Sequence, residues 1–182
     1  REAYTYGPTG DRLSASLNGG TAVPYTYAPG THRLASIGGT PRSYDANGNT
    51  QGGTAPNLTL GYDDRNRLAT ATAGVTTTTY GYNGRGERVS KQVGSGGFGQ
   101  APMQYVYDEA GHLLGDYQGA TSQAEYVYLD DTPIAVVKGN AVSYIETDHL
   151  GTPRQVVNPT TNQPLWTWDF LGGAFGTDAP KA

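Results

Sequence analysis

The 182-residue chain contains no cysteine, which excludes a disulfide framework and a metal site built on thiolates. Only 15% of its residues are charged, and the net charge of −4 comes without a basic stripe, so the composition argues against nucleic-acid binding. No apolar run approaches the roughly 18 residues of a transmembrane helix, and no signal peptide opens the chain. We therefore expect neither a membrane span nor a nucleic-acid partner.

Helical periodicity is missing as well. No window of the sequence places apolar residues at i, i+3, i+4 and i+7 over three turns. Glycine, proline, asparagine and aspartate instead recur at intervals of about eight to twelve residues, which is typical of short strands joined by turns. The sequence therefore predicts an all-β fold.

Tyrosine, by contrast, is regularly spaced. Thirteen of the fourteen tyrosines belong to a recurring phrase, either Tyr-x-Tyr or a single tyrosine, and we assign Tyr144 to one of the single copies. The last aromatic residue of the phrase stands at positions 6, 27, 44, 62, 82, 107 and 128, and Trp168 closes the series. The spacings of 17 to 25 residues define a period of about twenty, which indicates an array of equivalent units.

One copy shows the local structure that we expect. Tyr105 and Tyr107 are two residues apart, so in a strand both side chains point to the same face. Asp108 and Gly111 occupy positions i and i+3 of a predicted type I turn, where glycine accepts a positive φ. The unit is therefore predicted to be a β-hairpin with a short glycine-containing loop.

The other copies agree with this geometry. The residue four places after the last aromatic is a glycine or asparagine in five copies, and Thr31 is an exception to this pattern. These five residues are Gly10, Gly48, Asn66, Gly86 and Gly111. We predict about eighteen strands over residues 1–182 in a single array, and so many strands favour a curved, spiralling antiparallel sheet. Because the chain begins at Arg1 and ends at Ala182 without visible caps, we expect it to be a piece of a longer protein.

Residues 144–176 diverge from the hairpin phrase and contain the most distinctive motif. The motif is Asp148-His149-Leu150-Gly151-Thr152-Pro153-Arg154. A catalytic or metal-binding pair of Asp148 and His149 is one interpretation, but no third ligand or nucleophile motif stands nearby. We favour a structural turn with Pro153 at its exit, in which Arg154 either pairs with Asp148 or hydrogen-bonds loop carbonyls.

Other candidate sites are weaker. The adjacent carboxylates Asp63-Asp64 and Asp130-Asp131 fall at predicted hairpin turns, and neither has the spacing of a calcium-binding EF-hand loop. The glycine-rich stretch 94–99 lacks the lysine of a phosphate-binding loop and is predicted to be a surface loop. We therefore expect no catalytic residue, no cofactor and no metal site, so this segment is predicted not to be an enzyme.

The repeated Tyr-Asp-x-x-Gly-x-Leu phrase resembles the YD repeats of the RHS family. Tyr-Asp stands at 44–45, 62–63 and 107–108. The motif at 148–154 is similar to the phrase that marks the late part of an RHS core, and Trp166-Thr167-Trp168-Asp169-Phe170 is similar to the sequence that follows it. Single YD repeats are weak signals, whereas the array together with this motif is specific and covers essentially the whole chain.

The resemblance implies a structural role. RHS and YD-repeat proteins form a hollow β-shell around a C-terminal toxin domain, and related shells occur in insecticidal toxin complexes. On this basis the chain would be a shell module of a bacterial polymorphic toxin, exported by a type VI or another bacterial secretion system. Its partners would be neighbouring repeats and the enclosed toxin domain of the same polypeptide. Exposed sheet edges would also favour self-association.

The family's shell usually continues into an Asp-Pro-containing self-cleavage segment, and Asp178 is not followed by proline, so no protease role is assigned to it. A rival interpretation, from a different class, is an extracellular adhesion or carbohydrate-binding module that uses exposed tyrosine rows as platforms for sugars. Several solvent-exposed Tyr-x-Tyr pairs would favour the adhesion module. Tyrosines covered between neighbouring hairpins would favour the shell.

Overall fold

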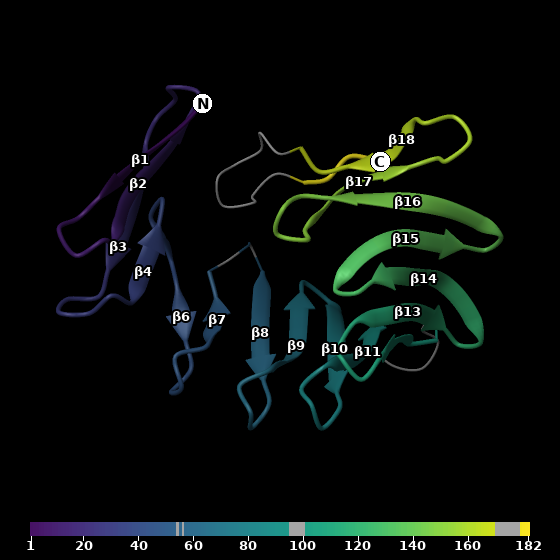
Figure 1. Ribbon diagram of the computed structural model, residues 1–182. Coiled ribbons are helices and arrows are strands. Elements are labelled where there is room, and N and C mark those ends of the chain that lie inside the picture. The colour runs from purple at the N-terminus through teal and green to yellow at the C-terminus, as the bar shows by residue number, and fades with distance from the viewer. Residues whose placement is uncertain (54, 56, 95–100, 170–178) are drawn as a thin grey trace. The chain divides into compact units, whose positions relative to one another are not determined.

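The computed structural model describes residues 1–53, 55, 57–94, 101–169 and 179–182 (Figure 1). All regular elements in these residues are β-strands, and the strands that pair do so in antiparallel fashion, which confirms the predicted all-β class. In the same residues there is no helix long and apolar enough to cross a membrane. The predicted loop at 94–99 lies outside the described residues beyond Gly94, as do 170–176 of the divergent segment.

The chain divides into two compact units. The first contains Arg1–Thr79 and Val93–Gly97, and the second contains Tyr80–Gln92 and Phe98–Ala182. The strands of the first unit are β1 (Glu2–Tyr6), β2 (Arg12–Leu17), β3 (Val23–Tyr27), β4 (Leu34–Ile37), β5 (Thr40–Pro41), β6 (Ser43–Tyr44), β7 (Thr50–Gly52), β8 (Leu58–Tyr62) and β9 (Leu68–Ala73). Strand β10 (Thr76–Tyr82) begins in the first unit and ends in the second.

The second unit holds the remaining strands, several of which bend along their length (Figure 1). They are β11 (Arg88–Val93), β12 (Met103–Tyr107), β13 (Leu113–Gln118), β14 (Thr121–Leu129), β15 (Thr132–Lys138), β16 (Ala141–Thr147), β17 (Pro153–Val157) and β18 (Pro164–Thr167). Beyond β18, the described residues add an isolated antiparallel bridge between Thr167 and Lys181.

Hydrogen-bonded neighbours follow the order of the chain. Strands β1 to β5 form one sheet in sequence order, β6 and β7 form a two-stranded sheet, and the order from β8 to β18 is again sequential. Since every strand pairs with the one that precedes or follows it, each repeat closes locally as a hairpin. This is the meander that the twenty-residue period predicts.

Two kinds of connection alternate along the chain. Each aromatic phrase is followed by a five-residue loop in most copies; between Tyr107 and Leu113, for example, the loop is 108–112. The return to the next repeat uses tighter links, such as the two-residue Gly38-Gly39. The copy at Tyr128 departs from the five-residue loop, because only the two-residue link Asp130-Asp131 joins Leu129 to Thr132. Asp130 has a φ of 50° there, a value that aspartate tolerates better than most residues. Both predicted carboxylate pairs therefore lie in turns.

Side chains alternate between two faces of the second unit. In β14 the residues at 122, 124, 126 and 128 are covered or half-covered, while their neighbours are exposed. We call the covered side the tyrosine face, because Tyr105, Tyr107, Tyr126 and Tyr128 lie on it. Tyr144 lies on the opposite face and is 56% exposed. Its assignment as a copy of the aromatic phrase was therefore wrong; Thr147, directly before Asp148, takes the place of the last aromatic.

The core is thin. The buried hydrophobic residues of the described chain are Ala124, Ala135, Val136 and Val157, all in the second unit. No described side chain is less than 2% exposed. Because a sheet with so few buried apolar side chains gains little stability from a core, it depends on contacts between neighbouring hairpins. These contacts form the candidate site.

Candidate functional site

Most five-residue loops begin with a residue whose side chain organises the whole turn. In the loop after Tyr107, the N–H of Gly111 donates to the carbonyl of Asp108, as in a type I turn, and the N–H of Asp108 donates to the carbonyl of His112. The carboxylate oxygen Oδ1 of Asp108 accepts from the N–H groups of Ala110 and His112, both at 2.9 Å. One side chain thus satisfies two backbone donors of its own loop.

The same arrangement recurs in five loops. Its first residue is Asp45, Asp63, Asn83, Asp108 or Asp148, and in every case Oδ1 accepts from the N–H groups two and four residues later at 2.8 to 3.0 Å. We call the four acidic members the turn aspartates. The fourth residue of each loop has positive φ; these residues are Gly48, Asn66, Gly86, Gly111 and Gly151. The exception predicted at Thr31 has a physical reason: its loop closes one residue later, from Ala28 to Arg33, and Gly30 takes the positive φ.

The second carboxylate oxygen of a turn aspartate binds a side chain of the same hairpin. Oδ2 accepts from Asn49 in the first case (2.9 Å), Arg67 in the second (2.8 Å) and Arg154 in the last (3.0 Å). Hydrogen bonds to these carboxylates lower their pKa values. The main cause is the side chain of Asn49 for Asp45 and the side chain of Arg67 for Asp63. For Asp108 the main cause is the backbone N–H of His112. For Asp148, burial opposes the shift, but donors from Leu150, Thr152 and Arg154 still lower its pKa.

Tyrosine hydroxyls tie each hairpin to the one before it. The last tyrosine of the phrase donates its hydroxyl to the carbonyl of the first residue of the preceding return strand. The pairs are Tyr27 with Arg12 (3.0 Å), Tyr44 with Leu34 (2.6 Å), Tyr62 with Thr50 (2.8 Å) and Tyr107 with Arg88 (3.1 Å). These hydroxyls are therefore engaged inside the array.

Arginines at the start of return strands stack between tyrosines of successive repeats. The Arg12 guanidinium lies 5.6 Å from the ring of Tyr4 and 4.3 Å from that of Tyr25. Arg88 lies likewise between Tyr80 (5.7 Å) and Tyr105 (4.6 Å). Such cation–π contacts join adjacent hairpins on the face that the tyrosines share.

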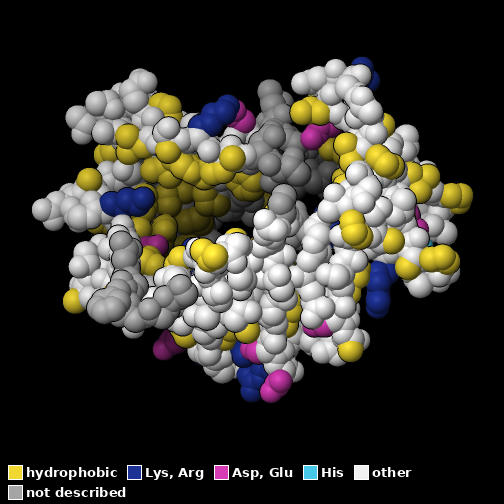
Figure 2. Space-filling model, turned by 180° about the vertical axis from the view of Figure 1, so that it is seen from behind, with side chains coloured by type: hydrophobic (Ala, Val, Ile, Leu, Met, Phe, Trp, Pro, Cys, Tyr) yellow, Lys and Arg dark blue, Asp and Glu magenta, His cyan; other side chains and the backbone are white. Residues whose placement is uncertain are grey.

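An apolar hollow of about 630 Å³ opens on the tyrosine face of the second unit (Figure 2). Pairing across the sheet aligns Tyr126 with Val136 and Ser143, and Ile145 with Val156 and Trp166. All six residues line the hollow. Burial raises the pKa of Tyr126, as does the nearby carboxylate of Asp116, so its hydroxyl stays neutral at physiological pH. The hollow can bury apolar groups, and its described lining offers no cluster of charged groups for chemistry.

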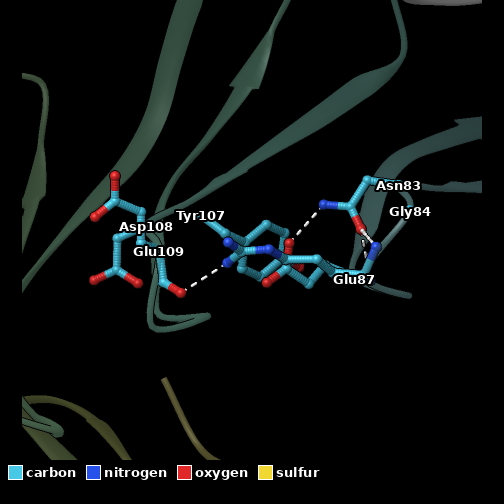
Figure 3. A pocket seen from close by; sticks show the side chains of 7 residues that line it. Asn83, Gly84, Glu87, Tyr107, Asp108 and Glu109 are labelled. Atoms are coloured by element: carbon cyan, nitrogen blue, oxygen red, sulfur yellow. Dashed lines mark hydrogen bonds between the residues drawn. The ribbon is translucent and has the colours of Figure 1, made fainter.

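A second, polar pocket lies between two loops of the second unit. It measures about 560 Å³ and is lined by Asn83, Gly84, Arg85, Glu87, Tyr107, Asp108 and Glu109 (Figure 3). The polar groups that line it are largely engaged with each other: Asn83 donates to Glu87, and Arg85 donates to the carbonyl of Glu109 at 2.7 Å (Figure 3). These bonds fix one loop against the next and do not assemble an acid, a base and a nucleophile.

The predicted site residues fall in two hairpins, in the loops and in the strands that flank them. Tyr105 and Tyr107 belong to β12 of the first hairpin, and Asp108 and Gly111 to the loop that follows it, as described above. In the other, Gly151 donates to the carbonyl of Asp148 at 3.0 Å, and Pro153 opens β17 opposite Thr147.

Arg154 binds Asp148 through Nε and stacks 4.9 Å from the ring of Trp168. His149 is exposed at the tip of the loop and is not brought together with a second acid or base. Among the described residues, no group of three His, Asp or Glu side chains could hold a metal ion.

Sequence reasoning missed three features of the site. The motif at 148–154 is another copy of the YD turn, which its Asp-x-x-Gly spacing could have revealed although threonine replaces the tyrosine. The pairing of Arg154 with Asp148 was one of the two predicted alternatives and is confirmed. The side chains that bind the other turn aspartates, and the carbonyls that accept from the hydroxyls, have no fixed residue type, so no sequence pattern marks them. The apolar hollow combines residues from six strands, β13 to β18, and has no local signal.

The sequence matches no protein-family model and no curated protein. Solved structures do match. A chain of the Photorhabdus luminescens Tc holotoxin pore superimposes with a TM-score of 0.64 at 13% identity, over 91% of this chain and 9% of that one. A chain in the crystal structure of TcdB2-TccC3 gives 0.61 at 13% identity, over 91% of this chain and 10% of that one. The fold is shared with Tc toxin components. This chain spans about a tenth of their length.

Proposed function

We propose that this chain is a wall module of an RHS-type shell and has no catalytic role of its own. In this proposal the hairpins continue a curved, spiralling strip of antiparallel sheet. The strip encloses a C-terminal toxin domain of the same polypeptide, and a bacterial export route, type VI or another, delivers the assembly. The fold shared with Tc toxin components supports the coarse part of this proposal, a structural shell role.

One observation carries the proposal: the recognisable residues of the repeat are used to join hairpins. The tyrosine hydroxyls bind the preceding return strand, the arginines stack between repeats and the turn aspartates close their own loops. A binding or catalytic module would leave such side chains directed at a ligand. In this chain they join each hairpin to its neighbour, which is what a continuous sheet in a shell needs.

The apolar hollow fits a lining that faces an enclosed polypeptide. Tyr126, Ile145 and Trp166 would offer apolar contact without a fixed pattern of hydrogen bonds, so the surface could hold an unfolded chain of any sequence. The rival adhesion function is less well supported, because the hydroxyls that a sugar would contact are bound to backbone carbonyls in four repeats.

The test uses the full-length gene product. If the chain is part of a shell, a domain encoded after it is protected from added protease, and the protection is lost when Tyr27, Tyr44, Tyr62 and Tyr107 are all changed to Phe. Equal protease sensitivity of that domain in both proteins, or the lack of any domain after Ala182 in the gene, would contradict the proposal. A change in tyrosine fluorescence on adding glycans would instead support the adhesion function.

Isolated from its neighbours, the segment should self-associate through its sheet edges. Sedimentation velocity of residues 1–182 is expected to show species larger than a monomer that grow with concentration. A single monomeric species at all concentrations would count against unpaired edges.

A further inference from the structure

His112 lies between two carboxylates that belong to different hairpins. Its Nδ1 is 2.8 Å from Oδ2 of Asp108, in the loop between β12 and β13. Its Nε2 is 3.0 Å from Oδ1 of Asp131, in the link between β14 and β15. The ring also stacks on Tyr128 of β14, with centroids 4.7 Å apart and an angle of 23°. One imidazole therefore joins two hairpins by both ring nitrogens and by one face.

Only the protonated ring satisfies both contacts. Neutral imidazole donates from one nitrogen and presents a lone pair at the other, which would face a carboxylate oxygen that can only accept. The imidazolium donates from both nitrogens and carries a positive charge between two negative ones. The geometry therefore distinguishes the two protonation states.

The groups around His112 favour the charged state. Asp108 and Asp131 are the two carboxylates in contact with it, and Glu87 approaches the same loop near Gly111 from the β10–β11 hairpin. Hydrogen bonding to Asp108 is the main cause that raises the pKa of His112, burial opposes it, and Asp131 adds to the increase. Asp131 is almost fully exposed, so water screens its contribution more than that of Asp108.

We propose that His112 is a pH-sensitive clamp that tightens the junction between the β12–β13 and β14–β15 hairpins when protonated and loosens it when neutral. The sign follows from the preference for the charged state. The clamp contributes its full stability below the ordinary histidine pKa of 6.5, and this contribution is lost as the pH rises through the raised value in the folded protein. Acidic solution therefore closes this junction and alkaline solution loosens it, whether or not the chain encloses a cargo.

A weaker version of the same contact occurs in the first unit. His32 Nδ1 lies 2.9 Å from Asp11, which again joins the loops of consecutive hairpins. The His32 side chain is 70% exposed and contacts one carboxylate only, whereas that of His112 is 20% exposed and contacts two. We expect the response to pH to be dominated by His112.

The chain itself supplies matched variants. Asp108→Asn keeps the turn, because Asn83 makes the same two backbone bonds in its own loop, but removes the charge. His112→Asn reproduces the natural Asp45–Asn49 pair and removes the titrating group. Asp131→Asn removes only the contact to the second hairpin. His149→Asn is the control, since His149 is exposed in an equivalent loop.

The first measurement is an NMR titration of the histidine ring protons in the intact chain. The midpoint of His112 is expected above 6.5, lower in Asp131→Asn, and lower again in Asp108→Asn. A midpoint at or below 6.5 in the unmodified chain overturns the proposal, and so does a midpoint that Asp131→Asn leaves unchanged.

The second measurement compares urea unfolding at pH 5.5 and pH 8.5, followed by tryptophan fluorescence from the second unit. The midpoint of the unmodified chain is expected to be higher at pH 5.5, and the difference should shrink in His112→Asn but persist in His149→Asn. An undiminished difference in His112→Asn overturns the clamp. If that variant does not fold, the titration of Asp131→Asn still decides the question.

Discussion

The hydrogen bonds from tyrosine hydroxyls to the preceding hairpin can be tested at Tyr44. Its hydroxyl donates to the carbonyl of Leu34 at 2.6 Å, and with the bond from Arg42 N–H to the Ala35 carbonyl it joins the β6–β7 sheet to β4. Tyr44→Phe removes one oxygen and keeps the ring, which still faces the Arg33 guanidinium 5.4 Å away. The substitution thus isolates a single hydrogen bond between hairpins.

The expected cost follows from the nature of that bond. A neutral hydroxyl-to-carbonyl bond stabilises a folded protein by about 0.5–1.5 kcal/mol net. Because Tyr44 is only half-buried, water can reach the orphaned carbonyl, so we expect a loss of about 1 kcal/mol rather than a full desolvation penalty. With a urea m-value of roughly 2 kcal/mol per M, the unfolding midpoint falls by about 0.5 M.

The assay must report the first unit. Both tryptophans lie in the second unit, so their fluorescence follows that unit, whereas circular dichroism follows the strands of both. Unfolding of the first unit is the part of the circular dichroism change that tryptophan fluorescence does not share. Tyr6→Phe is the matched control, because Tyr6 belongs to the first hairpin and is 53% exposed. Its midpoint should not move measurably. If Tyr44→Phe shifts the urea midpoint no more than Tyr6→Phe does, the Tyr44 hydroxyl does not hold the hairpins together.

Three further predictions concern the turns and the thin core. Gly111→Ala should destabilise the second unit by about 1–2 kcal/mol in urea unfolding, because the φ of 92° at this position is unfavourable for alanine. Gly111→Asn should destabilise it less, because asparagine tolerates a positive φ better. Val157→Ala should cost about 1.5 kcal/mol in the same assay, since the side chain is 3% exposed, whereas Val142→Ala, 48% exposed, should cost under about 0.5 kcal/mol. The turn aspartates have lowered pKa values, so their stabilisation is present above the ordinary aspartate pKa of 3.8 and is lost as the pH falls through the lower folded values. When all four are replaced by asparagine, the free energy of unfolding should fall less steeply with decreasing pH below about pH 4. An equally steep fall in this variant would contradict the role given to the turn aspartates.

Much of the local structure could be predicted from the sequence because it depends on neighbouring residues. A turn that needs an acceptor at its first residue and a positive φ at its fourth leaves a pattern of aspartate and glycine, as Asp108 and Gly111 show. Tyrosines two residues apart must share a face of a strand, and Tyr105 and Tyr107 do. The same reasoning failed at Tyr144, because a tyrosine without its following aspartate does not reveal the phase of the strand.

The sequence alone therefore determined an all-β array of hairpins with a period of about twenty residues, since turn chemistry and side-chain alternation are local. Only the tertiary structure decided what the tyrosines, arginines and histidines do, because their partners on the neighbouring hairpin lie about ten to twenty residues away. A carbonyl can be offered by any residue, and so the partner of Tyr44 has no sequence signature. The apolar hollow and the position of His112 between two carboxylates arise in the same way, from the register in which one hairpin lies against the next.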